Sequence, residues 1–336
     1  MRAAAPGLSA RVDEGASYTG WVTDPASSSN SFVPGDPELP TDLGELEALP
    51  PLESFLAALN LEDTGARTHE DIFTGKNQWM PTGRVFGGQV ASQSIMAAAR
   101  TLPDDRTLHS MRGNFLRPGD IHVPITFSVE RSHDGNSFST RLVQAYQHGE
   151  PIWSMIASFQ VDADGLEHQI DGPMDVPAPE ELPSASAQVA VAGSKIANYW
   201  LHRRPFEMRF VETPVYLQPP SNRTPTELVW MKATGPLPDD PMVHRAALAY
   251  ASDYVMLDPI LRRHGLTWTT PQLRMASLDH GMWWHRFARV DEWLLCSVRS
   301  VSSQGGRGLT TGEFYTRDGK LVASVAQEAM VRLKQR

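Results

Sequence analysis

The sequence predicts an α+β protein made of two similar halves, in each of which a long helix lies across a curved antiparallel sheet. Its length of 336 residues suits about two domains of ~150 residues each. Helix-like and strand-like segments occur twice in the same order, and weak identities relate them at a spacing of 170 residues, as between Gly149 and Gly319 or Leu108 and Leu278. The repeat therefore predicts a strand, a central helix and four antiparallel strands, twice over.

The composition is that of an ordinary folded protein, and it argues against two classes of partner. Apolar residues make up 41% of the chain, and 30 Lys and Arg against 39 Asp and Glu leave a formal net charge of −9. A nucleic-acid binder needs clustered cations to neutralise phosphates, so no nucleic-acid partner is expected. The sequence has no run of about 18 apolar residues and no secretory-signal pattern, so we expect no membrane contact and a cytoplasmic location.

The chain divides into four segments by composition. Residues 1–50 are rich in Ser, Pro, Gly and acidic residues without a sustained apolar period, which predicts a disordered tail because such a segment buries too little apolar surface to offset its chain entropy. Residues 51–165 form the predicted first half. Residues 166–195 are rich in Pro and Glu and are expected to be a linker. Residues 196–336 form the predicted second half, which carries the candidate catalytic residues.

In the first half, two helices and four strands follow the tail. Leu and Phe side chains recur at i, i+3, i+4 and i+7 from Leu52, which predicts a short amphipathic helix. The pair Gly87-Gly88 precedes a run of Ala, Ser, Ile and Met over 90–102, which is typical of a buried helix whose first turn approaches another backbone or a ligand. Strands are predicted over 108–116, 121–129, 139–146 and 152–161.

The second half repeats this pattern, with clear signals at the ends of its helix. Asp240 suits the N-cap and Pro241 the first helical position, so a helix is expected over 244–261, ending before Gly265. Strands are predicted over 275–287, 293–301, 309–315 and 321–333.

Comparison of the two halves singles out polar residues that only the second half carries. Asp253 follows an apolar stretch of the second central helix where the first helix has Ala97, and Gln327 lies in the last strand where the first half has Ala157. Ser277 has a hydroxyl counterpart in the first half. A carboxylate among apolar residues costs free energy unless it is hydrogen-bonded or used in function. From the residues alone, Asp253 is either a satisfied buried or helix-end acid, or part of a carboxylate site.

Familiar catalytic motifs are absent, which narrows the chemistry. The sequence has no G-x-S-x-G nucleophile elbow, no phosphate-binding loop, no G-x-G-x-x-G and no H-E-x-x-H. The single cysteine, Cys296, lies in an apolar strand, which favours a buried inert thiol and excludes an internal disulfide or a cysteine-cluster metal site. No cofactor and no metal are expected.

Seven segments of the chain, in the same order, resemble the acyl-CoA thioesterase II family. The similarity spans roughly residues 50 to 334. It implies a double hotdog fold, in agreement with the internal repeat, and hydrolysis of fatty acyl-CoA thioesters to a free acid and CoA. The segments are V-F-G-G-Q at 85–89, F-L-R-P-G-D at 115–120, D-G-N-S-F-S at 134–139, Y-A-S-D at 250–253, L-D-H-G-M-W at 278–283, G-E-F-Y at 312–315 and V-A-S-V-A-Q-E at 322–328.

The resemblance also implies a catalytic trio, which falls on Asp253, Ser277 and Gln327. In such a site Asp253 accepts a proton from water as general base, while the Ser277 hydroxyl and the Gln327 amide hold that water in line. Family members often have Thr where this chain has Ser277, which keeps the hydroxyl but loses a methyl group that restricts the rotamer. By analogy with hotdog thioesterases, the backbone N–H groups of Gly88 and Gln89 are the candidate oxyanion-hole donors.

Two alternatives remain open. A hotdog hydratase needs an Asp and a His five residues apart, whereas Asp258 and His264 are six apart. His280 is close to Ser277 in sequence, but the two would face opposite sides of one strand, so His280 is interpreted as structural. The other alternative is a non-catalytic acyl-CoA-binding or regulatory protein. In either case acyl-CoA is the expected small-molecule partner, and a homodimer or homotetramer is the expected assembly because hotdog proteins cover sheet edges by pairing.

Overall fold

The structure is a computed structural model that describes four stretches of the chain, namely residues 45–67, 69–192, 203–216 and 218–333. The predicted disordered tail lies outside the described residues as far as residue 44. Its last six residues were predicted wrongly, because they are ordered: Glu45–Ala48 forms a 3₁₀ helix (η1) with Leu46 buried, and Pro50 caps the next helix.

Thirteen strands form one antiparallel sheet. The first half contributes β1 (Glu62–Arg67), β2 (Glu70–Gly75), β3 (Thr107–Phe115), β4 (Ile125–Asp134), β5 (Phe138–Gln147) and β6 (Glu150–Gln160). The second half contributes β7 (Phe206–Phe210), β8 (Thr226–Ala233), β9 (Leu273–Ser277), β10 (Asp279–Trp284), β11 (Leu294–Gln304), β12 (Arg307–Thr316) and β13 (Leu321–Leu333).

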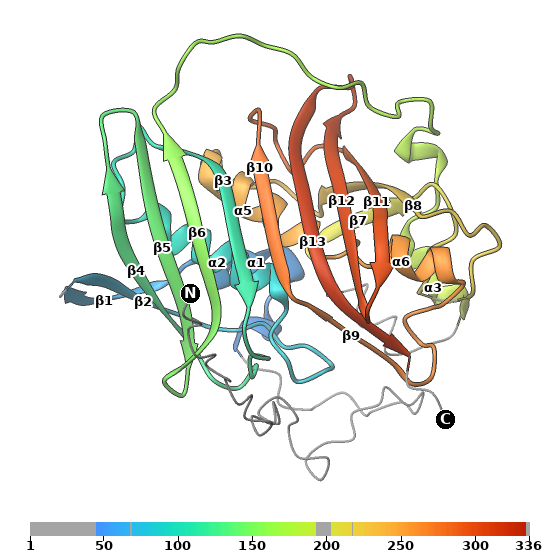
Figure 1. Ribbon diagram of the computed structural model, residues 1–336, viewed down its shortest axis with the longest axis horizontal. Helices are drawn as coiled ribbons and strands as arrows, with labels where there is room; N and C mark the ends of the chain where they lie inside the picture. The colour runs from blue at the N-terminus through green and yellow to red at the C-terminus, as the bar shows by residue number, and fades with distance from the viewer. Residues whose placement is uncertain (1–44, 68, 193–202, 217, 334–336) are drawn as a thin grey trace, which may run out of the picture.

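The strand order shows that the two halves repeat one arrangement (Figure 1). Across the sheet it is β1-β2-β4-β5-β6-β3-β10-β13-β12-β11-β8-β7, with β9 paired to β13 beside this path. The order reads the same from either edge once β7, β8, β10, β11, β12 and β13 are matched to β1, β2, β3, β4, β5 and β6. At the centre β3 pairs with β10, with Met111 opposite Met282, so the sheet runs continuously from one half into the other. The predicted two-half α+β arrangement is confirmed.

Two central helices, α2 (Gly87–Ala99) and α5 (Pro241–Ser252), lie behind the sheet (Figure 1). The predicted start of α5 is confirmed, because Asp240 Oδ1 accepts the N–H of Met242 at 2.8 Å. The helices run antiparallel, so the first turn of α2 meets the last turn of α5. They pack closely there: a Cβ atom added to Gly88 would lie 2.5 Å from the carbonyl oxygen of Tyr250.

The helix predicted over 244–261 is interrupted after Ser252. A second helix, α6 (Asp258–His264), begins after a turn and ends at Gly265, whose φ of +68° is the left-handed conformation of a helix cap. The interruption follows from Pro259, which lacks a backbone N–H and whose ring would clash with the carbonyl of Val255 in a continuous helix. The break leaves Asp253 as the C-cap of α5.

The segment predicted as a linker is packed against the second half over its described part, which ends at residue 192. Figure 1 shows the chain leaving β6 and crossing to that half, where it forms η2 (Pro179–Glu181) and α3 (Ala185–Ala192). On the way its apolar side chains, Met174, Val176 and Leu182, pack against a buried cluster of Trp230, Trp293, Leu295, Tyr315 and Leu321. The Pro-rich composition predicted a connection but not this packing.

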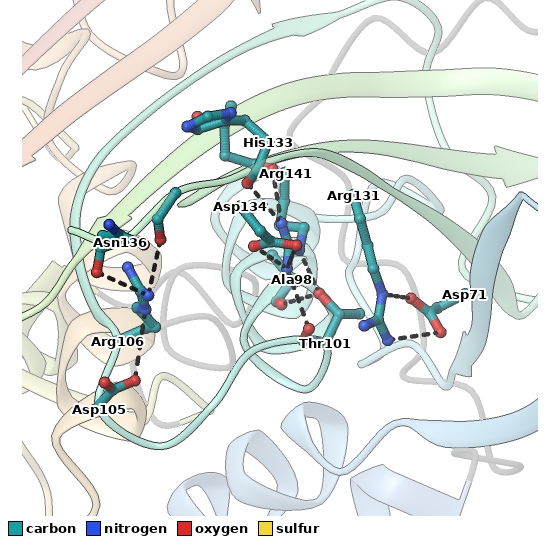
Figure 2. Close-up of polar contacts among 12 residues, drawn as sticks. Asp71, Ala98, Thr101, Asp105, Arg106, Arg131, His133, Asp134, Asn136 and Arg141 are labelled. Atoms are coloured by element: carbon teal, nitrogen blue, oxygen red, sulfur yellow. Dashed lines mark hydrogen bonds and ion pairs between the residues drawn. The ribbon is translucent and has the colours of Figure 1, made fainter. Parts of the chain in front are cut away.

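Helix α1 (Pro51–Leu59) confirms the predicted amphipathic helix, with Phe55 and Leu59 buried in the core. In the same half a buried cation joins α2 to the β4–β5 hairpin (Figure 2). Arg141 donates to Oγ1 of Thr101 (2.7 Å), just beyond α2, to both carboxylate oxygens of Asp134, and to the carbonyl oxygens of His133 and Thr140. Its guanidinium is therefore satisfied inside the protein.

Replacing Arg141 with methionine is expected to lower the free energy of unfolding by about 3 kcal/mol, because the buried Thr101 and several partly buried acceptors lose their donor at once. Urea unfolding followed by circular dichroism measures the change. The matched control is Arg317→Met, which removes an exposed ion pair with Glu180 and should cost less than about 1 kcal/mol. Equal losses for the two variants would contradict the assignment.

Candidate active site

The three residues of the predicted trio meet at one end of α5. Asp253 caps that helix, Ser277 ends β9 and Gln327 lies in the middle of β13. The side-chain amide of Gln327 donates to Ser277 Oγ at 2.7 Å and lies near enough to the Asp253 carboxylate to lower its pKa. Gln327 is buried, whereas Asp253 and Ser277 are only partly buried. The amide therefore lies behind a carboxylate and a hydroxyl that are both more accessible than itself.

The first half also contributes to this site, through the start of α2. The N–H of Gly88 donates to Asp253 Oδ2 at 2.9 Å, so the positive end of α2 faces the carboxylate. There is no room for a side chain at this approach, because a Cβ atom on Gly87 would lie 2.7 Å from Asp253 Oδ2 and 2.8 Å from the ring of Phe115. The Gly87-Gly88 pair therefore allows the helix end to reach the carboxylate.

Burial raises the pKa of Asp253 above its ordinary value, while the Gln327 amide and the Gly88 N–H oppose that rise. A carboxylate with a raised pKa is a stronger base than an ordinary aspartate, and it ionises in full only at a higher pH. The site therefore combines a more basic carboxylate with donors that hold its ionised form.

The structure overturns the interpretation of His280. The chain takes four residue steps from Ser277 to Gly281 but only three between their partners on β13, Ala329 and Ala326, so one residue is extra, as in a β-bulge. The extra residue shifts the alternation of side chains, and His280 comes to the same side as Ser277. Its Nδ1 lies 2.5 Å from Oε1 of Gln327. The prediction that the two residues diverge on one regular strand is wrong, because the strand is not regular.

The two predicted oxyanion donors already have acceptors within the protein. The N–H of Gly88 serves Asp253, and the N–H of Gln89 donates to the carbonyl oxygen of Phe86 at 3.1 Å. The geometry supports Gly88 as a group that holds the carboxylate, and it gives no support to an oxyanion role for either N–H.

Other candidate residues lie outside the site. Asp258 is buried and accepts a hydrogen bond from Trp268 at 2.7 Å, and burial raises its pKa to about 7, while His264 is exposed at the end of α6. The two therefore do not form the pair that a hydratase needs. Cys296 is fully buried, and burial raises the pKa of its thiol, which makes it unreactive.

The described part of the chain has neither a metal-binding cluster nor a membrane-spanning helix. No cluster of three or more His, Cys, Asp or Glu residues there could hold a metal ion. Among the helices of that part, none has the length and apolar character to cross a membrane.

Comparison with known proteins matches both halves of the chain. Residues 203–330 match the family described as acyl-CoA thioesterase, and residues 76–160 match its N-terminal domain. Acyl-coenzyme A thioesterase 8 of Homo sapiens is 36% identical over 291 residues, which cover 82% of this chain and 88% of that protein.

Solved structures are also similar to this chain. An acyl-CoA thioesterase II from Mycobacterium marinum has a TM-score of 0.68 and 38% identity, covering 84% of this chain and 98% of that one. A protein of unknown function with a hot dog fold, from Alicyclobacillus acidocaldarius, is only 19% identical but has the same TM-score of 0.68, covering 84% and 99% of the two chains, and so supports the fold alone. The predicted double hotdog is confirmed, and the chain belongs to the acyl-CoA thioesterase family.

Proposed function

We propose that this protein hydrolyses acyl-CoA thioesters to a free carboxylic acid and CoA, with a water molecule activated by Asp253, Ser277 and Gln327. One observation carries the assignment of the site: the Gln327 amide donates to the Ser277 hydroxyl at 2.7 Å and lies near enough to the Asp253 carboxylate to lower its pKa. A base and a hydroxyl able to orient water are therefore held beside each other by one amide. The family of the chain supports the reaction.

The proposed reaction proceeds by direct attack of water. Asp253 accepts a proton from the water as its oxygen bonds to the thioester carbonyl carbon, which gives a tetrahedral intermediate. The carbon–sulfur bond then breaks, the CoA thiolate leaves, and Asp253 returns its proton to solvent or to the thiolate. Water is consumed, and one acid and one CoA are formed. A thiolate is a good leaving group, so the mechanism needs no covalent intermediate with the enzyme.

The hydroxyl hydrogen of Ser277 is available as a donor in this arrangement. Its Oγ accepts from Gln327 Nε2, so its own hydroxyl hydrogen is not used in that bond. The hydrogen is available for the attacking water or for the carbonyl oxygen as negative charge develops there. A donor already positioned before the reaction stabilises such charge more than a mobile one. We therefore assign Ser277, rather than the two backbone N–H groups, as the candidate donor to the oxyanion.

The geometry favours hydrolysis over the hydratase alternative. A hydratase would use a histidine that reaches its substrate, but both ring nitrogens of His280 face protein groups, Ser252 at 2.9 Å and Gln327 at 2.5 Å. That histidine is 1% exposed. The non-catalytic alternative is disfavoured because all three polar groups of the trio are present and in contact.

Release of CoA from acyl-CoA substrates of short, medium and long chain tests the proposal. We expect a thiol reagent to detect continuous release for at least one chain length, with a matching amount of free acid. A hydratase would instead change the absorbance of an enoyl-CoA without releasing thiol, and a binding protein would retain intact acyl-CoA. Either of those outcomes would reject the hydrolase.

We also propose a homodimer or homotetramer and a cytoplasmic location. Exposed apolar side chains on the sheet support the assembly, since Phe138 and Ile156 are 53% and 46% exposed. The single thiol, Cys296, is buried and unpaired, which suits a reducing compartment. Sedimentation velocity across a range of protein concentrations should show a species of two or four chains, and a single-chain species throughout would reject the assembly.

A further inference from the structure

A line of hydrogen bonds runs from the interior of the protein to the hydroxyl of Ser277. Ser252 Oγ lies 2.9 Å from Nε2 of His280, and Nδ1 of that ring lies 2.5 Å from Oε1 of Gln327. The amide nitrogen of Gln327 then donates to Ser277 Oγ at 2.7 Å. Ser252, His280 and Gln327 are each at most 1% exposed, so water does not compete for these groups.

The hydrogen bonds of this line can all donate toward Ser277 or all donate away from it, and Asp253 favours one of these two arrangements. A side-chain amide has an acceptor end and a donor end, and reversing it would place the oxygen of Gln327 toward the site. An ionised carboxylate only accepts hydrogen bonds, so Asp253, which lies near the amide and already accepts the N–H of Gly88, favours the nitrogen on its side, where that nitrogen donates to Ser277 Oγ. The oxygen of Gln327 must then face His280, which has to present an N–H to it.

The ring of His280 can meet that demand while neutral. A neutral imidazole has one N–H, and placing it on Nδ1 leaves Nε2 as an acceptor for the hydroxyl of Ser252. Burial lowers the pKa of His280, which agrees with the neutral form. The hydroxyl hydrogen of Ser252 has two acceptors at 2.9 Å, Nε2 of His280 and the carbonyl oxygen of Ala249, and the proposed tautomer requires it to be shared between them.

We propose that His280 is a positioning residue whose Nδ1–H holds Oε1 of Gln327 and so turns the amide nitrogen toward Ser277 and Asp253, with Ser252 fixing the ring from behind. The inference rests on the proposed function, because it assigns a role within that same site. His280 does not touch the reacting atoms and acts through Gln327. The first half has Ala157 at the place of Gln327, so it offers no amide for such a chain to orient.

Variants of His280 separate positioning from simple packing. We expect His280→Leu to lower kcat by about 10- to 100-fold with little change in KM, since misplacing a catalytic group by about 1 Å costs up to ~10²-fold. His280→Asn keeps an amide N–H near the position of Nδ1 and should restore most of kcat. The matched control is His244→Leu, another buried histidine, at the far end of α5. It should lower Tm and leave kcat nearly unchanged. If loss of kcat follows Tm alike in all three variants, His280 is merely structural.

A double-mutant cycle tests whether His280 acts through Gln327. In a Gln327→Ala background, His280→Leu should change kcat by less than about twofold, because the amide that it orients is gone. An undiminished effect of His280→Leu in that background would overturn the proposal.

A measurement on the unaltered protein decides the matter if the variants do not fold. Long-range ¹H–¹⁵N spectra of the histidine side chains should show His280 neutral with its proton on Nδ1 between pH 6 and 8, and the Nε2 tautomer would overturn the proposal. The failures are distinguishable: if the wild type releases no CoA, the proposed function is wrong, whereas an active enzyme with the Nε2 tautomer rejects only the role of His280.

Discussion

Asp253→Asn is expected to lower kcat for acyl-CoA hydrolysis by roughly 10²- to 10⁴-fold, the contribution of a positioned general base. Asparagine has nearly the same size and keeps an oxygen for the N–H of Gly88, which now lies 2.9 Å from Asp253 Oδ2. The fold should therefore persist, with Tm close to that of the wild type. Thiol release at saturating substrate measures kcat, and KM is expected to change by less than about threefold because the lost contact is made to water.

The pH profile of the wild type gives a second measurement. A general base acts only when ionised, and burial raises the pKa of Asp253 above its ordinary 3.8. The rate should therefore fall as the pH falls through a value higher than that of a free aspartate. In Asp253→Asn this acid limb should disappear from the residual activity.

Asp279→Asn is the matched control for this substitution. Asp279 is also a partly buried carboxylate with a raised pKa, it lies two residues from Ser277, and it accepts the N–H of Glu328 at 2.7 Å, a bond that asparagine retains. Its variant should keep kcat within about twofold of the wild type. If the two variants lose activity equally, or if Asp253→Asn keeps most of its activity, Asp253 is not the base.

Gly88→Ala is expected to have the second largest effect, on both stability and rate. Alanine is intrinsically the better helix former by about 1 kcal/mol, so without a clash the variant would be more stable. The new Cβ atom, however, would lie 2.5 Å from the carbonyl oxygen of Tyr250, and a backbone atom cannot turn aside. We expect the free energy of unfolding to fall by about 2 kcal/mol, as in overpacked cores. The separation of α2 from α5 should lower kcat at least tenfold, because the N–H of Gly88 moves away from Asp253.

Gly165→Ala serves as the control for that substitution. An added Cβ atom there meets nothing within 4 Å, so stability and kcat should stay close to those of the wild type. Urea unfolding and thiol release on the same preparations give both quantities. A Gly88→Ala protein that is as stable and as active as the control would show that close contact between the helices is not required.

The sequence predicted most of the sheet because its repeat is visible in the strands with apolar alternation. β3, β5, β6, β11, β12 and β13 lie close to the predicted ranges, whereas β4 begins four residues after the predicted start and ends five after the predicted end. The outer strands β1, β2, β7 and β8 were not located. β1 reads Glu-Asp-Thr-Gly-Ala-Arg, which has no apolar alternation, and β7 alternates over only five residues, Phe-Glu-Met-Arg-Phe, which is short for a strand prediction. Their place is set by pairing with neighbours that a local pattern does not reveal.

Some residues around the site were located from the sequence, whereas some of their contacts were not, and the reasons differ from residue to residue. The resemblance located Asp253, Ser277 and Gln327, and the structure brings them together. His280 was misjudged because a bulge is a property of two paired strands, visible only as a change of register against β13. The bond from Gly88 to Asp253 joins residues 165 positions apart and depends on how two helices pack. The break in the helix before α6, by contrast, could have been predicted from Pro259.

Both halves of the chain contribute groups to the site, and this has a consequence for any attempt to separate the halves. The carboxylate, hydroxyl and amide all come from the second half, but the donor that secures the carboxylate belongs to the first, and β3 borders β10 along the middle of the sheet. A chain cut between the halves would thus yield one fragment with all three reactive groups and no competent enzyme. Activity would return only when the two fragments reassociate, since neither fragment contains the complete site.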